Sequence, residues 1–207
     1  MVIPDELAFT KSIEEVCRDN DILLFAVPSV FVRGTAAAAG KYIPDGQVIV
    51  DVAKGIEADT LMTMSEVIRR ELGKEPEKED GGEGGDTGRR APRNVKIVAL
   101  SGPTHAEEVA KDLPTTIVAA SPDEEAALFV QRVFMNDVMR VYTNDDITGV
   151  ELCGALKNII ALASGAALGL GYGDNTKAAL ITKEMHEITQ LGVAMGCDPG
   201  TFEGLAG

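Results

Sequence analysis

Short apolar runs separated by polar segments mark the first two-thirds of the chain. Four of them, at residues 21–27, 47–53, 95–101 and 115–121, are rich in β-branched side chains and do not alternate with polar residues. This pattern is typical of strands that are covered on both faces. A fifth run, at residues 138–143, is expected to add a strand at one edge.

Helical patterns lie between these runs, at residues 29–41, 60–72, 104–111 and 122–133. Regular alternation of strands and helices indicates βαβ units and therefore a parallel sheet. The fold class expected for this part of the chain is α/β, built on one parallel sheet.

The pattern changes after Asn144, because the remaining residues show helical periodicity only. Two long helices are expected at 146–168 and 174–195, and a short one starts at 198. We therefore predict two domains, an α/β domain at 1–144 and the start of an all-helical domain at 145–207.

Residues 74–94 contain no large apolar side chain, so we expect them to form a disordered surface insertion in the first domain.

The composition of the chain supports an aliphatic core, since 45% of the 207 residues are hydrophobic but only 4% are aromatic. The net charge of -14 argues against nucleic-acid or anionic membrane partners, which need clustered Lys and Arg. A small anionic substrate is compatible with this negative net charge, because a few lysines can make the electrostatic potential of one pocket positive.

Three cysteines that lie far apart in the chain, Cys17, Cys153 and Cys197, suggest a reducing compartment, so a cytoplasmic location is expected. The N-terminus has no signal-peptide pattern. The segment at 152–173 is long and apolar enough for a membrane-spanning helix, but a lysine and an asparagine interrupt it. We expect a buried helix of a soluble protein and no membrane insertion.

Lys157 is the only charged residue between Glu151 and Asp174. Lysine is seldom fully buried without a partner, and burial lowers the pKa of an amine, so Lys157 is a candidate to exchange protons near neutral pH. The alternative is a lysine whose stem lies in the core while its amine reaches water. Asn158 beside it is either a substrate contact or a local polar cap.

Other candidate groups follow the ends of the predicted strands. Lys54 ends the second strand, where open parallel sheets bind ligands, although a plain surface lysine is equally compatible with that position. Thr104 and Glu107 form a capping-box pattern that starts a helix after the third strand, with free N–H groups suited to an anion. Lys177 is expected in the first turn of a helix capped by Asp174 or Asn175, an unfavourable place for a cation unless it faces an anion.

No metal site is expected, because His105 and His186 have no neighbours at ligand spacing. The 207 residues also contain no Gly-x-Gly-x-x-Gly motif, which dinucleotide-binding domains carry in their first strand–helix turn.

Several stretches of the chain together resemble the NAD(P)-dependent glycerol-3-phosphate dehydrogenase family. The most specific is Gly149-Val-Glu-Leu-Cys-Gly-Ala-Leu-Lys157-Asn, which continues through Gly171-Tyr-Gly-Asp-Asn-Thr-Lys177 to the segment from Phe202. Shorter matches are Lys54-Gly-Ile-Glu, Leu100-Ser-Gly-Pro-Thr-His-Ala and Val141-Tyr-Thr-Asn-Asp-Asp. The resemblance covers almost the whole chain outside residues 74–94.

This resemblance implies a Rossmann-like, truncated sheet followed by a helical domain, and an oxidoreductase that uses NAD or NADP. The family interconverts dihydroxyacetone phosphate and sn-glycerol 3-phosphate, a precursor for phospholipid synthesis. Lys157 matches the catalytic lysine, which donates a proton to the carbonyl oxygen. The remaining matches are Phe31, Lys54 and Ala106 as cofactor contacts, and Lys54, Gly102, Thr104 and Asn158 as substrate contacts.

The resemblance implies a small phosphate substrate as a partner. A homodimer is a separate expectation, because a sheet that lacks the first βαβ unit of the family exposes an apolar edge and apolar faces. Two alternatives stay open. One is a catalytically silent fragment that serves as a binding or dimerising module, because the glycine-rich turn of the family is not among these residues. The other is a related reductase that acts on a β-hydroxy acid, since several such enzymes share the Lys-Asn helix.

Overall fold

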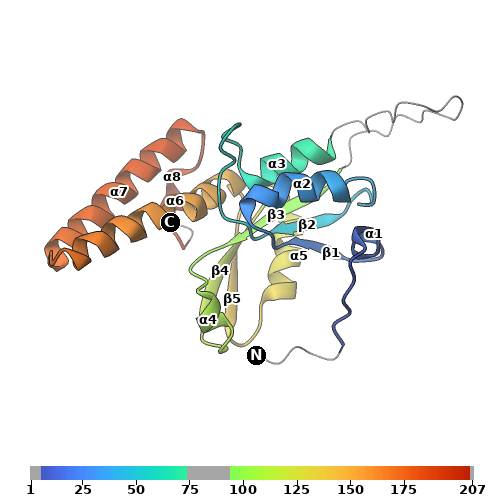
Figure 1. Ribbon diagram of the computed structural model, residues 1–207, viewed down its shortest axis with the longest axis horizontal. Coiled ribbons are helices and arrows are strands. Elements are labelled where there is room, and N and C mark those ends of the chain that lie inside the picture. Colours follow the sequence, from blue (N-terminus) through green and yellow to red (C-terminus); the bar gives the residue numbers. More distant parts are fainter. Residues whose placement is uncertain (1–5, 74–93, 206–207) are drawn as a thin grey trace, which may run out of the picture.

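A five-stranded sheet forms the centre of the computed structural model, which describes residues 6–73 and 94–205 (Figure 1). The strands lie in the sheet in chain order. They are β1 (Ile22–Phe25), β2 (Val48–Asp51), β3 (Lys96–Ser101), β4 (Thr115–Ala120) and β5 (Met139–Asn144). All five were predicted from the apolar runs, and the α/β, Rossmann-like fold class is confirmed.

One pairing in the sheet differs from the prediction. β1, β2 and β3 are mutually parallel, and β4 is parallel to β5, but β3 and β4 run antiparallel. The reason lies in the connection between β3 and β4, which holds only the four-residue helix α4 (Ala106–Val109). The connection at 102–114 is long enough for a parallel crossover of about a dozen residues, but its helix is short and buries none of its residues. The sheet is therefore mixed, and the prediction of an all-parallel sheet was wrong at this pair.

The helix expected at residues 104–111 is correspondingly shorter than predicted. His105, not Thr104, is the N-cap residue of α4, and the helix start has no side-chain cap bond. A complete capping box is found instead at α3 (Met64–Leu72), where Thr63 and Glu66 each bond to the other's backbone. Glu66 is followed by buried apolar residues that give the helix a packed face, whereas α4 buries none of its residues.

The other helices lie close to their predicted places. They are α1 (Ile13–Cys17), α2 (Ser29–Ala39), α5 (Glu124–Phe134), α6 (Ile147–Gly169), α7 (Asp174–Ala194) and α8 (Pro199–Phe202). Side chains that alternate along the strands separate two layers. Ile97 faces the core formed with α2 and α3, whereas Val98 faces the core formed with α5. The first turns of α6, together with α8, pack over Ala99 and Val118.

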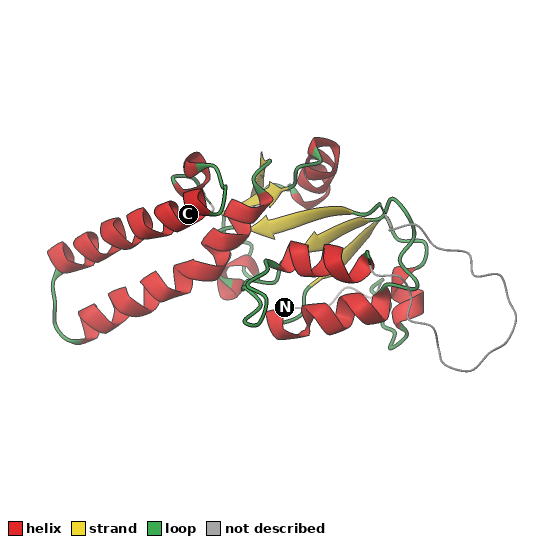
Figure 2. Cartoon of the chain, turned by 90° about the horizontal axis from the view of Figure 1, so that it is seen from above, coloured by secondary structure: helices red, strands yellow, loops and turns green. Residues whose placement is uncertain are grey.

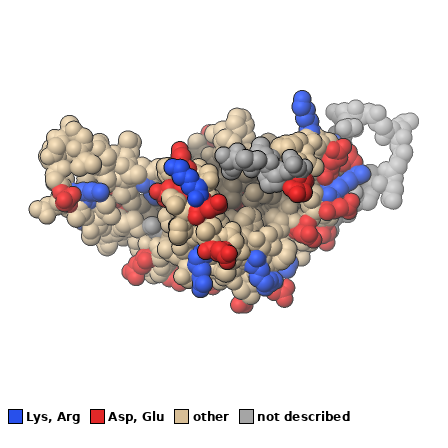
Figure 3. Space-filling view, turned by 90° about the horizontal axis from the view of Figure 1, so that it is seen from below, with Lys and Arg blue, Asp and Glu red and all other residues tan. Residues whose placement is uncertain are grey.

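The hairpin of α6 and α7 projects away from the sheet (Figure 2). The second half of α6 is buried on one face only, because Ile160, Ser164 and Ala167 are buried. The residues of the other face are exposed, at 61% for Ile159, 75% for Leu162 and 60% for Leu168. The prediction of a buried helix is thus wrong for this second face. By length and composition alone α6 is apolar enough to cross a membrane, and 28% of its most apolar stretch is buried. Few charged side chains appear on the projecting hairpin in Figure 3.

The predicted insertion at 74–94 lies, except for Asn94, outside the described residues. The boundary between domains near residue 145 stays a prediction, although no strand follows Asn144 within the described part of the chain.

Candidate active site

The carboxyl ends of three parallel strands place the predicted site residues at one edge of the sheet. Phe31 lies in the first turn of α2, after β1, and Lys54 lies three residues after the end of β2. Gly102 follows β3 directly. Ligands of open α/β sheets bind at such an edge. The helix α6 passes over β3 and brings Lys157 to the same place.

Two lysines converge on a single backbone oxygen at this edge. The Nζ of Lys157 donates to the carbonyl oxygen of Gly102 at 3.1 Å, and the Nζ of Lys54 donates to the same oxygen at 3.3 Å. Thr104 Oγ1 lies 3.5 Å from Lys54 Nζ and donates to Gly102 O at 3.4 Å. Each ammonium has three donors, so both retain hydrogens for a further acceptor, such as an oxygen of a bound ligand.

Two glycines make this convergence sterically feasible. Gly102 has φ of +150°, and a Cβ there would lie 3.0 Å from the Ile117 Cα and the Thr116 carbonyl oxygen. Gly154, one turn before Lys157 on α6, faces the site closely: a Cβ there would lie 2.9 Å from Ser101 Oγ and 3.7 Å from Lys54 Cγ. A larger residue at Gly154 would push α6 away from the sheet edge.

The electrostatics of the site lower the pKa of Lys54. Burial lowers the pKa of Lys54 to about 8, and the neighbouring ammonium of Lys157 adds to the decrease. Lys157 itself is half-buried, and its amine is bound to Gly102. The structure therefore places Lys157 inward at the site, against the alternative in which the amine only reaches water.

Two buried acids, which the sequence reasoning missed, lie on the same segments of the chain as the two lysines. Glu151 on α6 is 8% exposed, and Asp51, the last residue of β2, is 2% exposed. Glu151 accepts hydrogen bonds from the backbone N–H and the hydroxyl of Ser65 on α3, at 2.8 and 2.5 Å. Burial, with the charge of Glu151 as a minor addition, raises the pKa of Asp51 to about 7. The signal in the sequence was an acid inside an apolar run, at Asp51 and again at Glu151.

The structure thus brings together four of the predicted residues, which are Lys54, Gly102, Thr104 and Lys157. The other three lie outside this hydrogen-bonded group. Phe31 is 61% exposed on α2, Ala106 is exposed in the first turn of α4, and Asn158 is exposed on α6.

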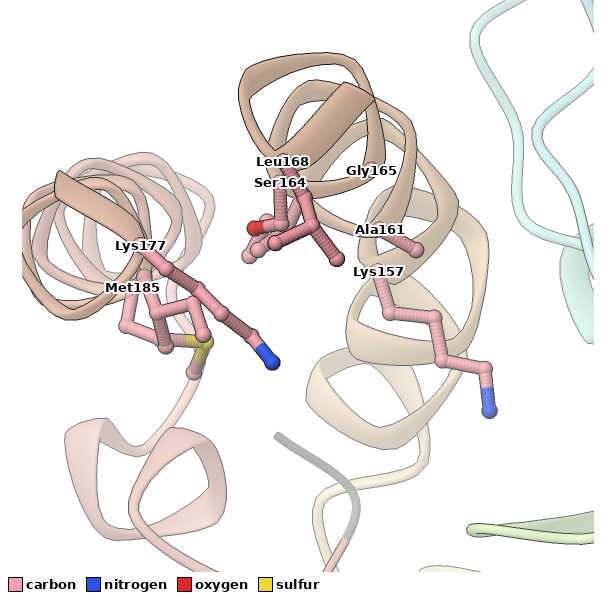
Figure 4. Close-up of a pocket in the computed structure, with 9 residues that line it drawn as sticks. Lys157, Ala161, Ser164, Gly165, Leu168, Lys177 and Met185 are labelled. Carbon is pink, nitrogen blue, oxygen red and sulfur yellow. The ribbon is translucent and has the colours of Figure 1, made fainter. Parts of the chain in front are cut away.

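A pocket of about 440 Å³ opens between α6 and α7, next to this group (Figure 4). Lys177 extends from α7 into the space between the helices, whereas the amine of Lys157 points away from that space. Lys54 and Lys157 therefore meet at Gly102 and not in the pocket.

Gly173, rather than Asp174 or Asn175, is the N-cap of α7, so the predicted side-chain cap was wrong. Lys177 lies in the first turn as predicted, and its role towards an anion stays a prediction.

Within residues 6–73 and 94–205, no group of three His, Cys, Asp or Glu side chains is arranged to hold a metal ion. His105 pairs with Glu107 at 3.1 Å, and both side chains are exposed.

Comparison with family models matches both parts of the chain to one family. The model described as the NAD-dependent glycerol-3-phosphate dehydrogenase N-terminus matches residues 1–79 and 88–127. The model of the C-terminus of the same family matches residues 146–207. The gap at 80–87 falls inside the segment whose composition indicated an insertion.

Curated relatives give the same result. The chain is 63% identical over 207 residues to glycerol-3-phosphate dehydrogenase [NAD(P)+] 2 of Lactobacillus delbrueckii subsp. bulgaricus, covering 100% of this chain and 57% of the relative. It is 48% identical over 205 residues to glycerol-3-phosphate dehydrogenase [NAD(P)+] of Agathobacter rectalis, covering 99% of this chain and 55% of the relative. The chain thus spans little more than half the length of these relatives.

Among solved structures, the fold is similar to a glycerol-3-phosphate dehydrogenase from Coxiella burnetii. The TM-score is 0.80 at 31% identity, over 95% of this chain and 54% of that one. A glycerol-3-phosphate dehydrogenase from Saccharomyces cerevisiae gives a TM-score of 0.80 at 25% identity, over 99% of this chain and 56% of that one.

Proposed function

The chain belongs to the NAD-dependent glycerol-3-phosphate dehydrogenase family, and from this membership we propose that it carries the proton-transfer site of an enzyme interconverting sn-glycerol 3-phosphate and dihydroxyacetone phosphate. The observation that supports this most strongly is the convergence of Lys54 and Lys157 on the Gly102 carbonyl oxygen. Two ammonium groups aimed at one oxygen are suited to a substrate whose carbonyl oxygen gains negative charge during reduction.

In this proposal Lys157 is the general acid. As the carbonyl carbon of dihydroxyacetone phosphate is reduced, the Nζ of Lys157 donates a proton to the carbonyl oxygen, and the neutral amine takes it back in the reverse direction. Lys54 and the hydroxyl of Thr104 hold the same region of the substrate by hydrogen bonds. Burial and the neighbouring ammonium lower the pKa of Lys54 to about 8, so this site favours an amine that gives up its proton near the operating pH, where acid–base groups are most effective.

The residues at this edge fit a nicotinamide cofactor. Phe31 exposes its ring at the edge where β1, β2 and β3 end, which suits packing against a planar group, and Ala106 presents only a small side chain there. NAD(P)H, when bound, supplies the hydride, and NAD(P)⁺ accepts it in the reverse direction. We propose Phe31, Lys54 and Ala106 as the residues of this chain that contact it, and Gly102, Thr104 and Asn158 as substrate contacts with Lys54.

We further propose a cytoplasmic protein with a helical domain at 145–207 and an α/β domain at 1–144. We also propose that the chain forms a homodimer. Size-exclusion chromatography coupled to light scattering tests this expectation, because a dilution-independent mass of 21.8 kDa, that of one chain, would contradict it.

A chimeric enzyme tests the proposed function. The 207 residues replace the matched part of the Lactobacillus relative, which is 63% identical to them. NADH oxidation is followed with dihydroxyacetone phosphate, in parallel with a β-keto acid, and the chain by itself is assayed beside the chimera. The proposal predicts turnover of dihydroxyacetone phosphate by the chimera. A chimera that folds and binds NADH but is inactive would indicate a silent segment, and turnover of only the keto acid would indicate the related reductase.

A further inference from the structure

Glu151 is a buried acid that links the helix carrying Lys157 to the α/β domain. It lies on α6 six residues before Lys157, and its carboxylate accepts two hydrogen bonds from Ser65 on α3. Ser65 is the second residue of α3, so its N–H is one of the free donors at a helix start. The carboxylate of α6 therefore caps a helix far away in sequence, where a negative charge is also favoured by the helix dipole.

This contact constrains α6 differently from the apolar packing around it. Val150, Leu152 and Cys153 bury the same turns of α6 against β3 and β4. Apolar burial is non-directional, so it holds the helix on the sheet without fixing its rotation or its axial position strictly. Two hydrogen bonds to one serine do fix both. Six residues further along, about 9 Å at 1.5 Å per residue, the position of the Lys157 amine depends on that rotation.

The buried acid is also costly to keep. Burial raises the pKa of Glu151, and the hydrogen bonds from Ser65 oppose that effect. The groups around it include Asp51 on β2, and Thr63 and Glu66 on α3. An apolar side chain at this place would avoid the desolvation of a carboxylate, so stability alone does not explain an acid here.

We propose that Glu151 is a positioning residue, which through its contact with Ser65 sets where Lys157 meets Lys54 and the Gly102 carbonyl oxygen. The inference rests on the proposed function insofar as Lys157 is the proton donor, but its geometric part is independent of catalysis. When the Glu151–Ser65 contact is removed, α6 shifts on α3, and both Lys157 and Gly154 move away from Lys54.

The titration of Lys54 reports this movement. Its pKa is lowered to about 8 by burial and by the neighbouring Lys157, and α6 contributes to both causes. The test is an NMR titration of the 207-residue chain labelled at lysine Cε, with the Lys54 signal assigned by its loss in Lys54→Arg. In Glu151→Ala the midpoint is expected to rise from about 8 towards the ordinary lysine value of 10.5. Removal of a negative charge near a lysine lowers the pKa of that lysine, so a rise in the Lys54 midpoint reports movement of α6 and not a change of charge.

Three further variants sharpen the test. Glu151→Gln loses the charge but can still bond to the N–H and hydroxyl of Ser65, so its midpoint is expected to stay at or below about 8. Ser65→Ala keeps the acid and removes one hydrogen bond, so a smaller rise is expected, and this variant serves if Glu151→Ala does not fold. Val130→Ala, which opens a cavity under α5 on the other face of the sheet, is the control for general destabilisation and should leave the midpoint unchanged.

Turnover in the chimera gives the second readout. Glu151→Ala is expected to lower kcat at least tenfold with KM changed less than threefold, and Glu151→Gln to restore most of kcat. An unchanged Lys54 midpoint in both Glu151→Ala and Ser65→Ala would overturn the inference. A rise in the midpoint in a protein that shows no turnover at all would support the positioning role and would contradict only the proposed function.

Discussion

Lys54 and Lys157, one from a strand–helix loop and the other from the long helix α6, donate to the same carbonyl oxygen of Gly102 at 3.3 and 3.1 Å. Like charges so close together disfavour each other, and the pKa of Lys54 is lowered to about 8, by burial first and by Lys157 second. Stability alone therefore does not explain the pair, since two ammonium groups at one oxygen repel each other unless an anionic group of a ligand lies between them.

Replacing Lys157 by Met should raise the pKa of Lys54. The substitution removes the neighbouring positive charge and keeps a side chain of similar length, so only the burial of Lys54 remains to lower its pKa. NMR titration of Lys54 should therefore give a midpoint between about 8 and 10.5 in Lys157→Met. Lys177→Met is the matched control, because Lys177 points into the pocket between α6 and α7, and its loss should leave the midpoint in place. Equal midpoints in the wild type and Lys157→Met would show that the two amines are not neighbours.

Replacing Gly154 by Ala should impair the site more than it affects stability. The new methyl group meets Ser101 Oγ at 2.9 Å and approaches Lys54, whereas Ala is favoured over Gly in a helix by about 1 kcal/mol. We expect a free energy of unfolding within about 1 kcal/mol of the wild type, but a changed Lys54 titration and lower turnover. Gly165→Ala on the same helix meets nothing within 4 Å and should stabilise the protein without moving the Lys54 titration. Urea denaturation and NMR measure the two effects separately.

Replacing Gly102 by Ala should destabilise the protein by roughly 2–3 kcal/mol. The backbone at φ +150° is unfavourable for any residue with a Cβ, and that atom would press on the backbone of Ile117 and Thr116. Gly46→Ala separates the two causes, because Gly46 has φ of +78° but nothing within 4 Å of the added methyl. Its loss should be only about 1 kcal/mol. Chemical denaturation measures both effects. If the two substitutions lower the free energy of unfolding by similar amounts, the contact of the added methyl group with the backbone of Thr116 and Ile117 costs nothing.

Asp51 should make stability fall as the pH rises. Its pKa is raised from 3.8 to about 7 in the folded protein, so between these values the folded state binds more protons than the unfolded state. The stability that this difference provides is complete below pH 3.8 and is lost as the pH rises through about 7. Asp51→Asn should therefore raise the free energy of unfolding by roughly 1–3 kcal/mol at pH 8 and by much less at pH 5. Denaturation curves at both pH values check this, and an equal effect at the two values would contradict the shift.

The strands could be predicted because their apolar runs are short, β-branched and clearly bounded, and all five appear in the structure. The direction of β4 could not, because it depends on how far α4 extends, and the Thr104–Glu107 pattern exists in the sequence without an apolar face to stabilise the helix. The exposure of one face of the second half of α6 could not be predicted either, since an apolar run looks the same whether or not other residues cover it.

Lys54 and Lys157 could be predicted as site residues because each has a sequence signal, a strand end for Lys54 and a lone charge in an apolar helix for Lys157. Thr104 was a candidate through its capping-box pattern, and Gly102 came only from the family resemblance. What the sequence did not reveal is that Lys54 and Lys157 share one oxygen. The contact between Glu151 and Ser65 was equally hidden, because it joins two helices through a single carboxylate and leaves no periodic pattern.

The rate of substrate reduction in the Lys157→Met chimera tests the central claim most directly. Under saturating NADH and dihydroxyacetone phosphate, single-turnover reduction should fall by about 10²–10⁴-fold, because the proton donor is lost while Lys54 and Thr104 still bind the substrate. NADH binding, measured by fluorescence, should stay within about threefold of the unsubstituted chimera, since a kcat effect without a binding effect is expected of a group acting in the transition state. Reduction by Lys157→Met at a rate within threefold of the unsubstituted chimera would show that Lys157 is not the proton donor.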